Sequence, residues 1–390
     1  MYMYSRCACH RPRPLTIAFR VYKLYSPGVT HAFHARDVVD GAYPLPPGDL
    51  ADPHRQQLLR SHDMEISAVA TSTTGALLAT GQAGSTHRKG YPAPVVVWDY
   101  AATRPTFQLD GLTQGVCHVS FSPDERFVMG CGLDCLLYIW DTATGEVVLG
   151  KRQAKAVALG CWGQVDTAGR RPVYQVFICV GKDILALKLG FDVVRRQWEL
   201  TGGAMGIPSS GLPRNYHCMS LLAGQDFLVG GTDVGDMIVY RVGANVYRAS
   251  VPVCSGGLLS VCVHPSPADA SSEQVVFCGA GDGTIRKVVG GDMKWRLEGE
   301  VCLDAGVVSL SLRAQETELM AGTRAGSVYL VRVADLSFTK VSAAPKAAVR
   351  ALSCGPRADA FAACTDDGVA RVWGLDDYAV LAEAAPARAG

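Results

Sequence analysis

Apolar and polar residues alternate along most of the chain in short runs, which are separated by turns rich in glycine, proline and aspartate. Residues 66–69 and 77–80 form one pair of such runs, and residues 258–263 and 275–278 form another. Alternation with a period of two is typical of half-buried antiparallel strands. No helical period of comparable length is present in the sequence. The pattern therefore predicts an all-β protein.

One unit recurs along the chain, in which two such strands precede a β-rich strand that ends in Trp-Asp or in a degenerate form of it. The clearest copies end in Trp98-Asp99 and Trp140-Asp141, and the last ends in Trp373. From Trp98 to Trp373 there are 275 positions over six intervals, a mean of about 46, close to the period of roughly 40–45 of a four-stranded propeller blade. The repeat predicts a β-propeller. Its seven copies lie at residues 95–99, 137–141, 184–188, 237–240, 284–288, 328–331 and 369–373.

Two of these copies resemble a WD repeat. Residues 120–127, followed by Gly132-Leu133-Asp134 and residues 138–141, carry the first resemblance, and residues 365–368 leading to Trp373 carry the second. The resemblance implies that a turn aspartate six residues before the tryptophan joins a structural hydrogen-bond network with it. The positions that match are Asp134, Asp367 and, with Val288 in place of tryptophan, Asp282; Val234 and Ala325 occupy the same place in two blades where the network is expected to be lost.

A narrower resemblance is carried by residues 65–70, 77–82 and 95–100, and further along by residues 306–313, 319–323 and 361–364. In this order and at this spacing, from about residue 43 to residue 377, they are similar to the cilia- and flagella-associated protein 52 family. The echinoderm microtubule-associated proteins share the Ala79-Thr80-Gly81-Gln82 feature. The resemblance implies a WD-repeat protein with two propellers, on the luminal face of axonemal doublet microtubules.

Two departures from that family leave alternatives open. The family carries a second propeller, whereas this sequence ends at Gly390, and the first blade of the family is hard to find in residues 1–55. The chain is therefore a partial gene product, a diverged paralogue or a form with one propeller. In the family alignment, residues near Tyr43 belong to an earlier blade and Trp373 opens the second propeller.

The seven copies by themselves predict one WD-repeat propeller with seven blades of four antiparallel strands. We place it in residues 43–390, with clear blades at about 56–377. Residues 56–60 could supply the outer strand that completes the last blade. An unclosed ring would expose a sheet edge, which favours aggregation.

Charge and composition narrow the class of partner. The chain has 37 basic and 36 acidic residues, a balance that argues against nucleic acid as a partner, because nucleic-acid binding needs clustered uncompensated cations. No apolar stretch approaches the ~18 residues that span a membrane. The 14 cysteines are too few for a disulfide scaffold, and many lie inside apolar runs. We expect a reducing, cytoplasmic location, and the resemblance adds the cytoskeleton and the axoneme of the cilium or flagellum.

Residues 1–42 form a basic segment without the repeat. The first 36 residues hold six basic side chains and no acidic one. Such a segment suits an organellar transit peptide, a basic arm that contacts an acidic partner, or a poorly ordered start.

No motif in the sequence supplies a complete catalytic or cofactor site. Residues 145–151 match the first seven places of a phosphate-binding loop, but Arg152 stands where Ser or Thr would hold magnesium. The glycines of residues 279–283 join two strands, so no helix N-terminus is available for a pyrophosphate. Cys7, Cys9 and His10 lack the second ligand pair of a structural zinc site. We predict a protein that is not an enzyme and that has no cofactor and no metal.

Two long excursions from the repeat carry the candidate partner-binding residues. The first, residues 81–92, contains Arg88, Lys89 and Tyr91, and the second, residues 190–216, is a longer one. Arginine pairs bidentately with carboxylates and tyrosine adds amphipathic contact area, which suits an acidic surface such as tubulin. The alternatives are a solvated loop for the first excursion and a tryptophan buried at a blade edge for the second. The candidates in the second excursion are Arg195, Arg196 and Trp198.

These observations lead to a non-catalytic WD-repeat scaffold. The family resemblance implies a structural microtubule-associated component of the axoneme that contacts tubulin and other axonemal proteins. The alternative is a cytosolic WD-repeat adaptor that presents partners within a multiprotein complex.

Overall fold

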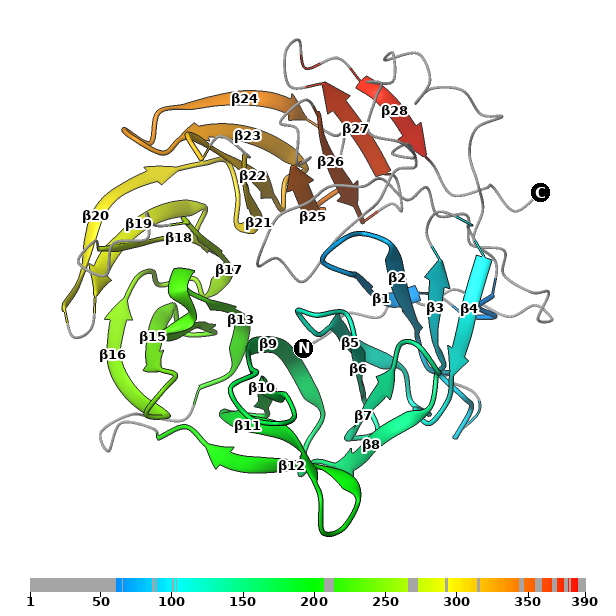
Figure 1. Cartoon of the computed structure of the whole chain (residues 1–390). Coiled ribbons are helices and arrows are strands. Elements are labelled where there is room, and N and C mark those ends of the chain that lie inside the picture. The colour runs from blue at the N-terminus through cyan, green and yellow to red at the C-terminus, as the bar shows by residue number, and fades with distance from the viewer. Residues whose placement is uncertain are drawn as a thin grey trace.

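The fold is a ring of seven four-stranded antiparallel sheets, each made from consecutive strands of the chain (Figure 1). This confirms the predicted all-β propeller with seven blades of four antiparallel strands. The computed structural model describes residues 61–64, 66–85, 88, 90–99, 102, 104–206, 214–265, 273–291, 294–313, 316–343, 347–354, 360–366, 370–374, 378 and 380–384. The basic segment and the proposed boundary between residues 42 and 43 lie outside these ranges.

The strands follow one another around the ring, four to a blade. The first two blades contain β1 (Ile66–Thr71), β2 (Leu77–Gln82), β3 (Val95–Asp99), β4 (Arg104–Leu109), β5 (Val116–Phe121), β6 (Phe127–Gly132), β7 (Leu136–Asp141) and β8 (Val147–Arg152). The third and fourth contain β9 (Val157–Asp166), β10 (Val173–Val180), β11 (Asp183–Asp192), β12 (Gln197–Ala204), β13 (Tyr216–Leu221), the short 3-10 helix η3 (Ala223–Gln225), β14 (Phe227–Thr232), β15 (Asp236–Arg241) and β16 (Val246–Pro252). The last three contain β17 (Leu258–Val263), β18 (Gln274–Ala280), β19 (Thr284–Gly291), β20 (Lys294–Cys302), β21 (Val307–Leu312), β22 (Glu318–Thr323), β23 (Ser327–Arg332), β24 (Phe338–Ala343), β25 (Val349–Cys354), β26 (Ala360–Thr365), β27 (Ala370–Gly374) and β28 (Val380–Ala384).

Burial differs between the strands of a blade and explains which of them the sequence reveals. The second strand is covered by neighbouring blades on both faces, and every residue of β6 is buried. The fourth strand lies at the rim, where β8 has no buried residue. The strands that end in Trp-Asp are the third strands of their blades, each followed by a rim strand.

Every inner strand begins with an irregularity in its pairing. In β1 the register shifts between Ile66 and Ala68, and the other six inner strands shift at the equivalent place. A bulge of this kind increases the local twist of the strand. Seven repeats of one bulge are consistent with seven sheets that turn in the same way around the axis.

Neighbouring blades are joined by shared apolar clusters. Six clusters each span two successive blades, from the first pair through to the sixth and seventh. The inner strands pack against one another in the same sequence from β1 to β25. Among the described residues, β25 and β1 share no comparable packing, and the cluster of Leu78, Val96 and Trp98 stays within the first blade. We call the junction between the seventh and first blades the seam (Figure 1).

The last blade corrects two expectations. Its outer strand is β28, which pairs with β27, so it is not supplied by residues 56–60, which lie outside the described ranges. Trp373 lies in β27 of the same ring and packs with residues of the sixth and seventh blades. It therefore does not open a second propeller.

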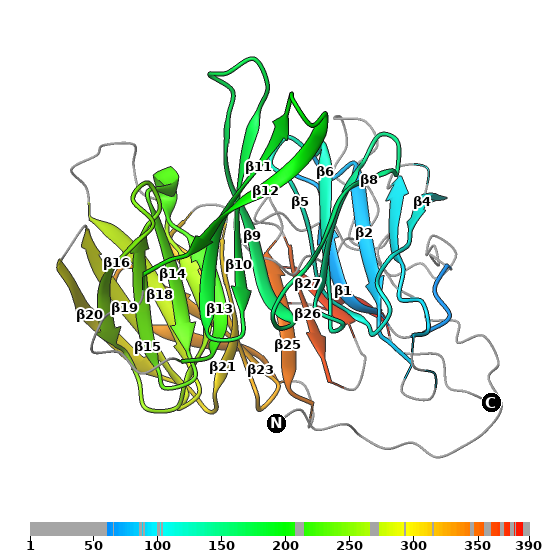
Figure 2. The ribbon, with the colours of Figure 1, turned by 90° about the horizontal axis from the view of Figure 1, so that it is seen from below.

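The third blade differs from the others in length. Its strands β9 and β11 have 10 residues each and β10 and β12 have 8, whereas most other strands have 6. Figure 2 shows the hairpins of this blade, in green, rising beyond the rest of the ring on one face. Within the described part of the chain no helix is long and apolar enough to cross a membrane. The cysteines described there are free of disulfides.

Candidate protein-binding surfaces

The first candidate loop connects β2 to β3 and rests on a chain of hydrogen bonds within the first blade. The indole N–H of Trp98 donates to Thr80 Oγ1 over 2.8 Å, and His62 Nε2 lies 2.7 Å from the same hydroxyl. On the opposite side of the imidazole, His62 Nδ1 lies 3.1 Å from Gln82 Oε1. The chain joins the entering segment to both strands that carry the loop.

The hydrogen bonds of Gln82 fix which of its amide atoms faces His62. The amide nitrogen of Gln82 donates to Asp63 Oδ1 over 2.7 Å, so its oxygen faces His62. His62 Nδ1 then donates to Gln82 Oε1, while Nε2 lies beside the Thr80 hydroxyl, which also lies 3.4 Å from the carbonyl oxygen of Val96. Burial lowers the pKa of His62, opposed by the hydrogen bond to Gln82 and the charge of Asp63. The hydrogen bond to Gln82 orients the imidazole, and burial disfavours its charged form.

Tyr91 and Arg88 lie on this loop. The phenol of Tyr91 donates a hydrogen bond to Asp63 Oδ2, which lowers the pKa of Asp63 and raises that of Tyr91. The guanidinium of Arg88 lies 5.9 Å from the Tyr91 ring centre and its backbone N–H donates to Ser85 Oγ. Arg88 is exposed, whereas Tyr91 is half-buried. Lys89 lies outside the described residues.

The turn aspartates do not form the network that the WD resemblance implies. Asp134 accepts hydrogen bonds from the backbone and hydroxyl of Thr113 and from the backbone of Leu136, and Trp140 Nε1 is buried with no partner. The residue that faces Trp140 at the place of Thr80 is Gly130, because both pair two positions from their tryptophan. Without a hydroxyl at that place, the indole N–H has no acceptor.

The other positions behave in the same local way. Asp282 accepts from the backbone and hydroxyl of Thr284, within its own turn. Val234 and Ala325 are exposed. Asp367 lies outside the described residues. In the described blades these aspartates hold turns.

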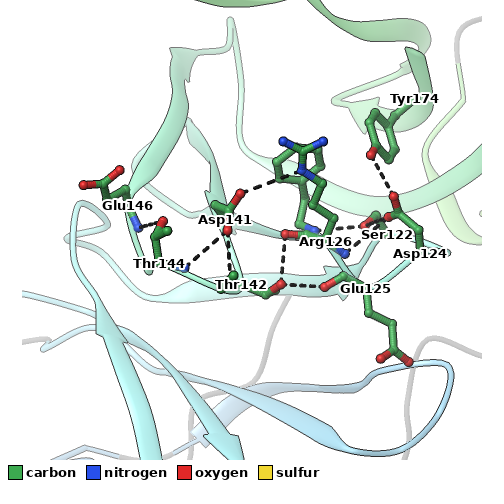
Figure 3. A network of polar contacts seen from close by, with 11 residues as sticks. Ser122, Asp124, Glu125, Arg126, Asp141, Thr142, Thr144, Glu146 and Tyr174 are labelled. Carbon is green, nitrogen blue, oxygen red and sulfur yellow. Dashed lines mark hydrogen bonds and ion pairs between the residues drawn. The ribbon is translucent and has the colours of Figure 1, made fainter. Parts of the chain in front are cut away.

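A polar network joins the second blade to the third on the face where the third blade projects (Figure 3). Tyr174 donates to Asp124 Oδ2 over 2.7 Å, and the Arg126 Nε lies 3.8 Å from Asp141 Oδ2. Burial, aided by the hydrogen bond to Asp124, raises the pKa of Tyr174 to about 12. Thr142 donates to the carbonyl of Glu125, which ties the two turns of the second blade together.

Trp198 packs above this network rather than standing free. Its ring meets Phe127, Tyr174 and Phe191 edge-on at 5.1, 6.3 and 5.6 Å. The guanidinium of Arg126 lies 5.4 Å from its centre. Trp198 is half-buried. The structure thus favours the blade-edge alternative for this residue over a free anchor.

Arg195 and Arg196 lie in the turn between β11 and β12, which is a hairpin tip. Residues 190–192 belong to β11 and residues 197–204 to β12, so most of the expected excursion up to residue 206 is strand. Arg195 Nη1 donates to Glu199 Oε1 over 2.6 Å, which lowers the pKa of Glu199 and raises that of Arg195. Arg196 is exposed, with a left-handed φ of 54°.

The two candidate loops do not form one site. The β2–β3 loop follows the second strand of a blade and the β11–β12 tip follows the third, and successive hairpin turns of an antiparallel sheet lie at opposite ends. Arg88 and Tyr91 therefore lie on one face of the ring, and Arg195 and Arg196 on the other. A propeller of this form offers two separate contact faces.

The described residues contain no group of three or more His, Cys, Asp or Glu side chains that could hold a metal ion. Residues 145–151 run from a turn into β8, and Gly281 and Gly283 form the turn between β18 and β19, so neither motif precedes a helix. His264 Nε2 lies 3.1 Å from the carbonyl oxygen of Glu316. Cys7, Cys9 and His10 lie outside the described ranges.

Sequence reasoning missed His62, Thr80 and Arg126. The signal for Thr80 was available, because it is the only hydroxyl at the place that faces a third-strand tryptophan; the other two places hold Gly130 and Ala363. Arg126 gave no local signal, because its aromatic neighbour Trp198 lies 72 positions away in sequence.

Comparison with known proteins agrees with this architecture. Residues 103–141 match the family model "WD domain, G-beta repeat". Crystallised Sqt1 of Chaetomium thermophilum shares 16% identity at a TM-score of 0.64, over 81% of this chain and 83% of its own, a likeness of fold.

Two relatives carry functional names. "Echinoderm microtubule-associated protein-like 2" of Homo sapiens is 25% identical over 382 residues, which are 90% of this chain and 54% of that protein. "Cilia- and flagella-associated protein 52" of Sus scrofa is 22% identical over 326 residues, 82% of this chain and 49% of that protein. The chain thus spans about half the length of these relatives. It is a seven-bladed β-propeller in which residues 103–141 match a WD-repeat model, and it is similar over most of its length to proteins named for microtubules, cilia and flagella.

Proposed function

We propose that this chain is a non-catalytic scaffold and a structural, microtubule-associated component of the ciliary or flagellar axoneme. In this role it contacts tubulin and neighbouring axonemal proteins, as a doublet microtubule inner protein does. The observation that carries the proposal is the similarity over 90% and 82% of the chain to proteins named for microtubules and for cilia and flagella.

The two faces of the ring support the proposal. Arg88 projects from one face and Arg196 from the other, and both are exposed. Exposed guanidinium groups pair well with the carboxylates of an acidic protein surface. Contacts on both faces let one propeller bridge two partners, which is what a scaffold within a filament requires.

The experiment is extraction of doublet microtubules from ciliated cells that express the tagged chain. A structural axonemal component stays with the doublets through washes of rising salt, because its contacts are multiple and largely enclosed. A cytosolic adaptor washes out at low salt. Diffuse cytoplasmic signal in ciliated cells, together with loss at the first wash, would contradict the axonemal role.

A variant comparison ties the retention to the two faces. Arg88→Gln and Arg196→Gln each remove one exposed cation, and we expect the double variant to wash out at lower salt than the natural chain. Arg332→Gln removes an exposed cation from the sixth blade and serves as the matched control.

A further inference from the structure

The two projecting turns of the third blade form one surface. It consists of the β9–β10 turn, residues 166–172, and the β11–β12 turn, residues 192–197; we call these residues the tip surface. Both turns extend from strands of 8 or 10 residues, so they stand clear of the neighbouring blades on that face (Figure 2). A surface that stands clear of its own fold is accessible to a partner from several directions.

The tip surface carries apolar side chains that the fold does not cover. Val193 is 68% exposed and Val194 is 92% exposed, the two largest values among the exposed large apolar residues described. These two valines are adjacent in a turn, and their side chains are exposed to solvent and do not contribute to the hydrophobic core. Exposed apolar side chains that are ringed by polar ones mark interaction sites.

The surrounding charges are mainly cationic. The two turns hold Arg170, Arg171, Arg195 and Arg196 against Asp166 and Asp192. The two aspartates accept hydrogen bonds from turn N–H groups, namely those of Ala168, Val194 and Arg195. Neither Arg170 nor Arg196 has an ion-pair partner among the described residues. Arg196 lies in the same turn as the two valines, and Arg170 lies in the other turn of the tip surface.

The tip surface is held in place before any partner binds. Arg171 lies 3.9 Å above the ring of Phe191, which packs on Trp198, and Trp198 in turn stacks near Arg126 of the second blade. This row of alternating cations and aromatic rings joins the tip to the polar network of Figure 3. Preorganised contacts lose less conformational entropy when a partner binds.

We propose that the tip surface docks an acidic segment of a partner protein, in which carboxylates flank an apolar side chain. The carboxylates pair with Arg170 and Arg196, and the apolar group covers Val193 and Val194. Charge complementarity favours this occupant, and the valines favour a protein segment over a phosphate backbone, which has no apolar group for them to cover. The proposal deepens the scaffold function above and rests on it for the biological setting alone.

The test uses two labelled peptides and the full chain. One peptide has glutamates around two central leucines, and the other has glutamines in place of the glutamates. We expect the glutamate peptide to bind, with an affinity that falls as salt rises because the contacts are exposed charges. Fluorescence anisotropy measures both affinities.

Two double variants assign the contact. R170Q/R196Q and V193S/V194S should each weaken binding of the glutamate peptide by about tenfold, which corresponds to about 1.4 kcal/mol. R104Q/R332Q removes the same charge from exposed positions on the first and sixth blades and should bind as the natural chain does. Thermal unfolding of each variant checks that the ring is intact.

Three outcomes would overturn the proposal. The first is equal binding by R170Q/R196Q and the natural chain, and the second is equal binding of the two peptides. The third is an RNA oligonucleotide or an anionic vesicle whose binding depends on Arg170 and Arg196 while that of the peptide does not. If the peptide results hold but the tagged chain washes off doublets, the axonemal role fails and the docking surface stands. If the chain resists salt and the peptide results fail, the reverse is true.

Discussion

Two polar groups in the first blade depend on a single hydroxyl. Thr80 Oγ1 accepts the indole N–H of Trp98 and is hydrogen-bonded to the ring of His62. Replacing Thr80 by valine keeps the shape and removes both hydrogen bonds. Since a buried polar group left unpaired costs about 1–3 kcal/mol, we expect Thr80→Val to lower the free energy of unfolding by an amount in that range.

Urea unfolding of the variant measures this loss. Thr80→Ser keeps the hydroxyl and should lie close to the natural chain, apart from the lost methyl group. An unfolding midpoint of Thr80→Val equal to that of the natural chain would show that the chain of hydrogen bonds contributes no stability.

His62 makes stability depend on pH in one direction. Its pKa is lowered by burial from the ordinary 6.5. Above that value His62 is unprotonated in both the folded and the unfolded protein, and protonation costs the folded state no stability. As the pH falls from there through the lower folded pKa, the unfolded state binds the proton first and stability is lost.

Thermal unfolding at pH about 7.5 and about 5.5, on either side of the ordinary histidine pKa, measures the effect. We expect His62→Asn to be less stable than the natural chain at the higher pH and to lose less on acidification. An equal loss of stability on acidification in both proteins would show that His62 does not cause the pH dependence.

Residue identity in the sequence predicted the tryptophans but not their partners. The Trp-Asp repeat located Trp98, Trp140 and Trp373 correctly in third strands. Whether an indole N–H finds an acceptor depends on the second-strand residue that pairs two positions before the tryptophan. This residue is Thr80 in the first blade and Gly130 in the second. A cross-strand neighbour is a property of register, and the motif alone does not contain it.

At the scale of elements, side chains from one inner strand satisfy the backbone of the next. Ser309 Oγ of β21 accepts the N–H of Leu352 in β25 over 2.9 Å, and Ser311 Oγ accepts that of Cys354 over 3.1 Å. Both serines and both donor residues are buried. These hydrogen bonds join the sixth and seventh blades, between which no strand ladder runs.

Removing one of these hydroxyls should loosen the seventh blade. We expect Ser309→Ala to cost about 1–3 kcal/mol and to raise hydrogen exchange in β25 more than in β13. Mass spectrometry of exchanged peptides measures this, with the exposed Ser337→Ala as the control. Unchanged exchange in β25 would mean that the apolar cluster alone holds this blade.

The rim strands are the elements that sequence reasoning failed to place. The pattern located the first three strands of a blade because their apolar residues are buried. Most residues of β4 are exposed and β8 has no buried residue, so the sequences of these strands show little alternation of apolar and polar residues. A rim strand is held mainly by backbone hydrogen bonds, so its sequence shows no clear pattern. The sequence therefore indicated residues 56–60, and not β28, as a possible outer strand of the last blade.

At the scale of the whole molecule, the ring is unevenly joined. Shared clusters connect each blade to the next from the first to the seventh, and no comparable one crosses the seam among the described residues. Local opening is easiest where few buried apolar contacts must separate. The seam is therefore the expected place of first opening.

Hydrogen exchange across the ring tests this expectation. We expect amides of β1 and β25 to exchange faster than those of β13 and β17, which lie in blades packed on both sides. Uniform protection of all seven inner strands would contradict it, and would indicate that the ring closes as tightly at the seam as elsewhere.

The candidate binding residues were predicted from the sequence, but their arrangement in the whole molecule was not. The sequence identified Arg88, Tyr91, Arg195 and Arg196 as candidates, but it could not tell that the two loops lie on opposite faces. It also could not bring Arg126 beside Trp198, because contacts between blades depend on the closed arrangement of the sheets.

Each blade is built from one unbroken stretch of chain, since no strand is exchanged across the seam. The backbone could therefore be cut between any two described blades, and the old ends linked, without separating two paired strands. Circular permutants opened at such junctions keep every sheet whole. The order of the blades around the ring is therefore essential to the fold, whereas the blade at which the chain starts is not.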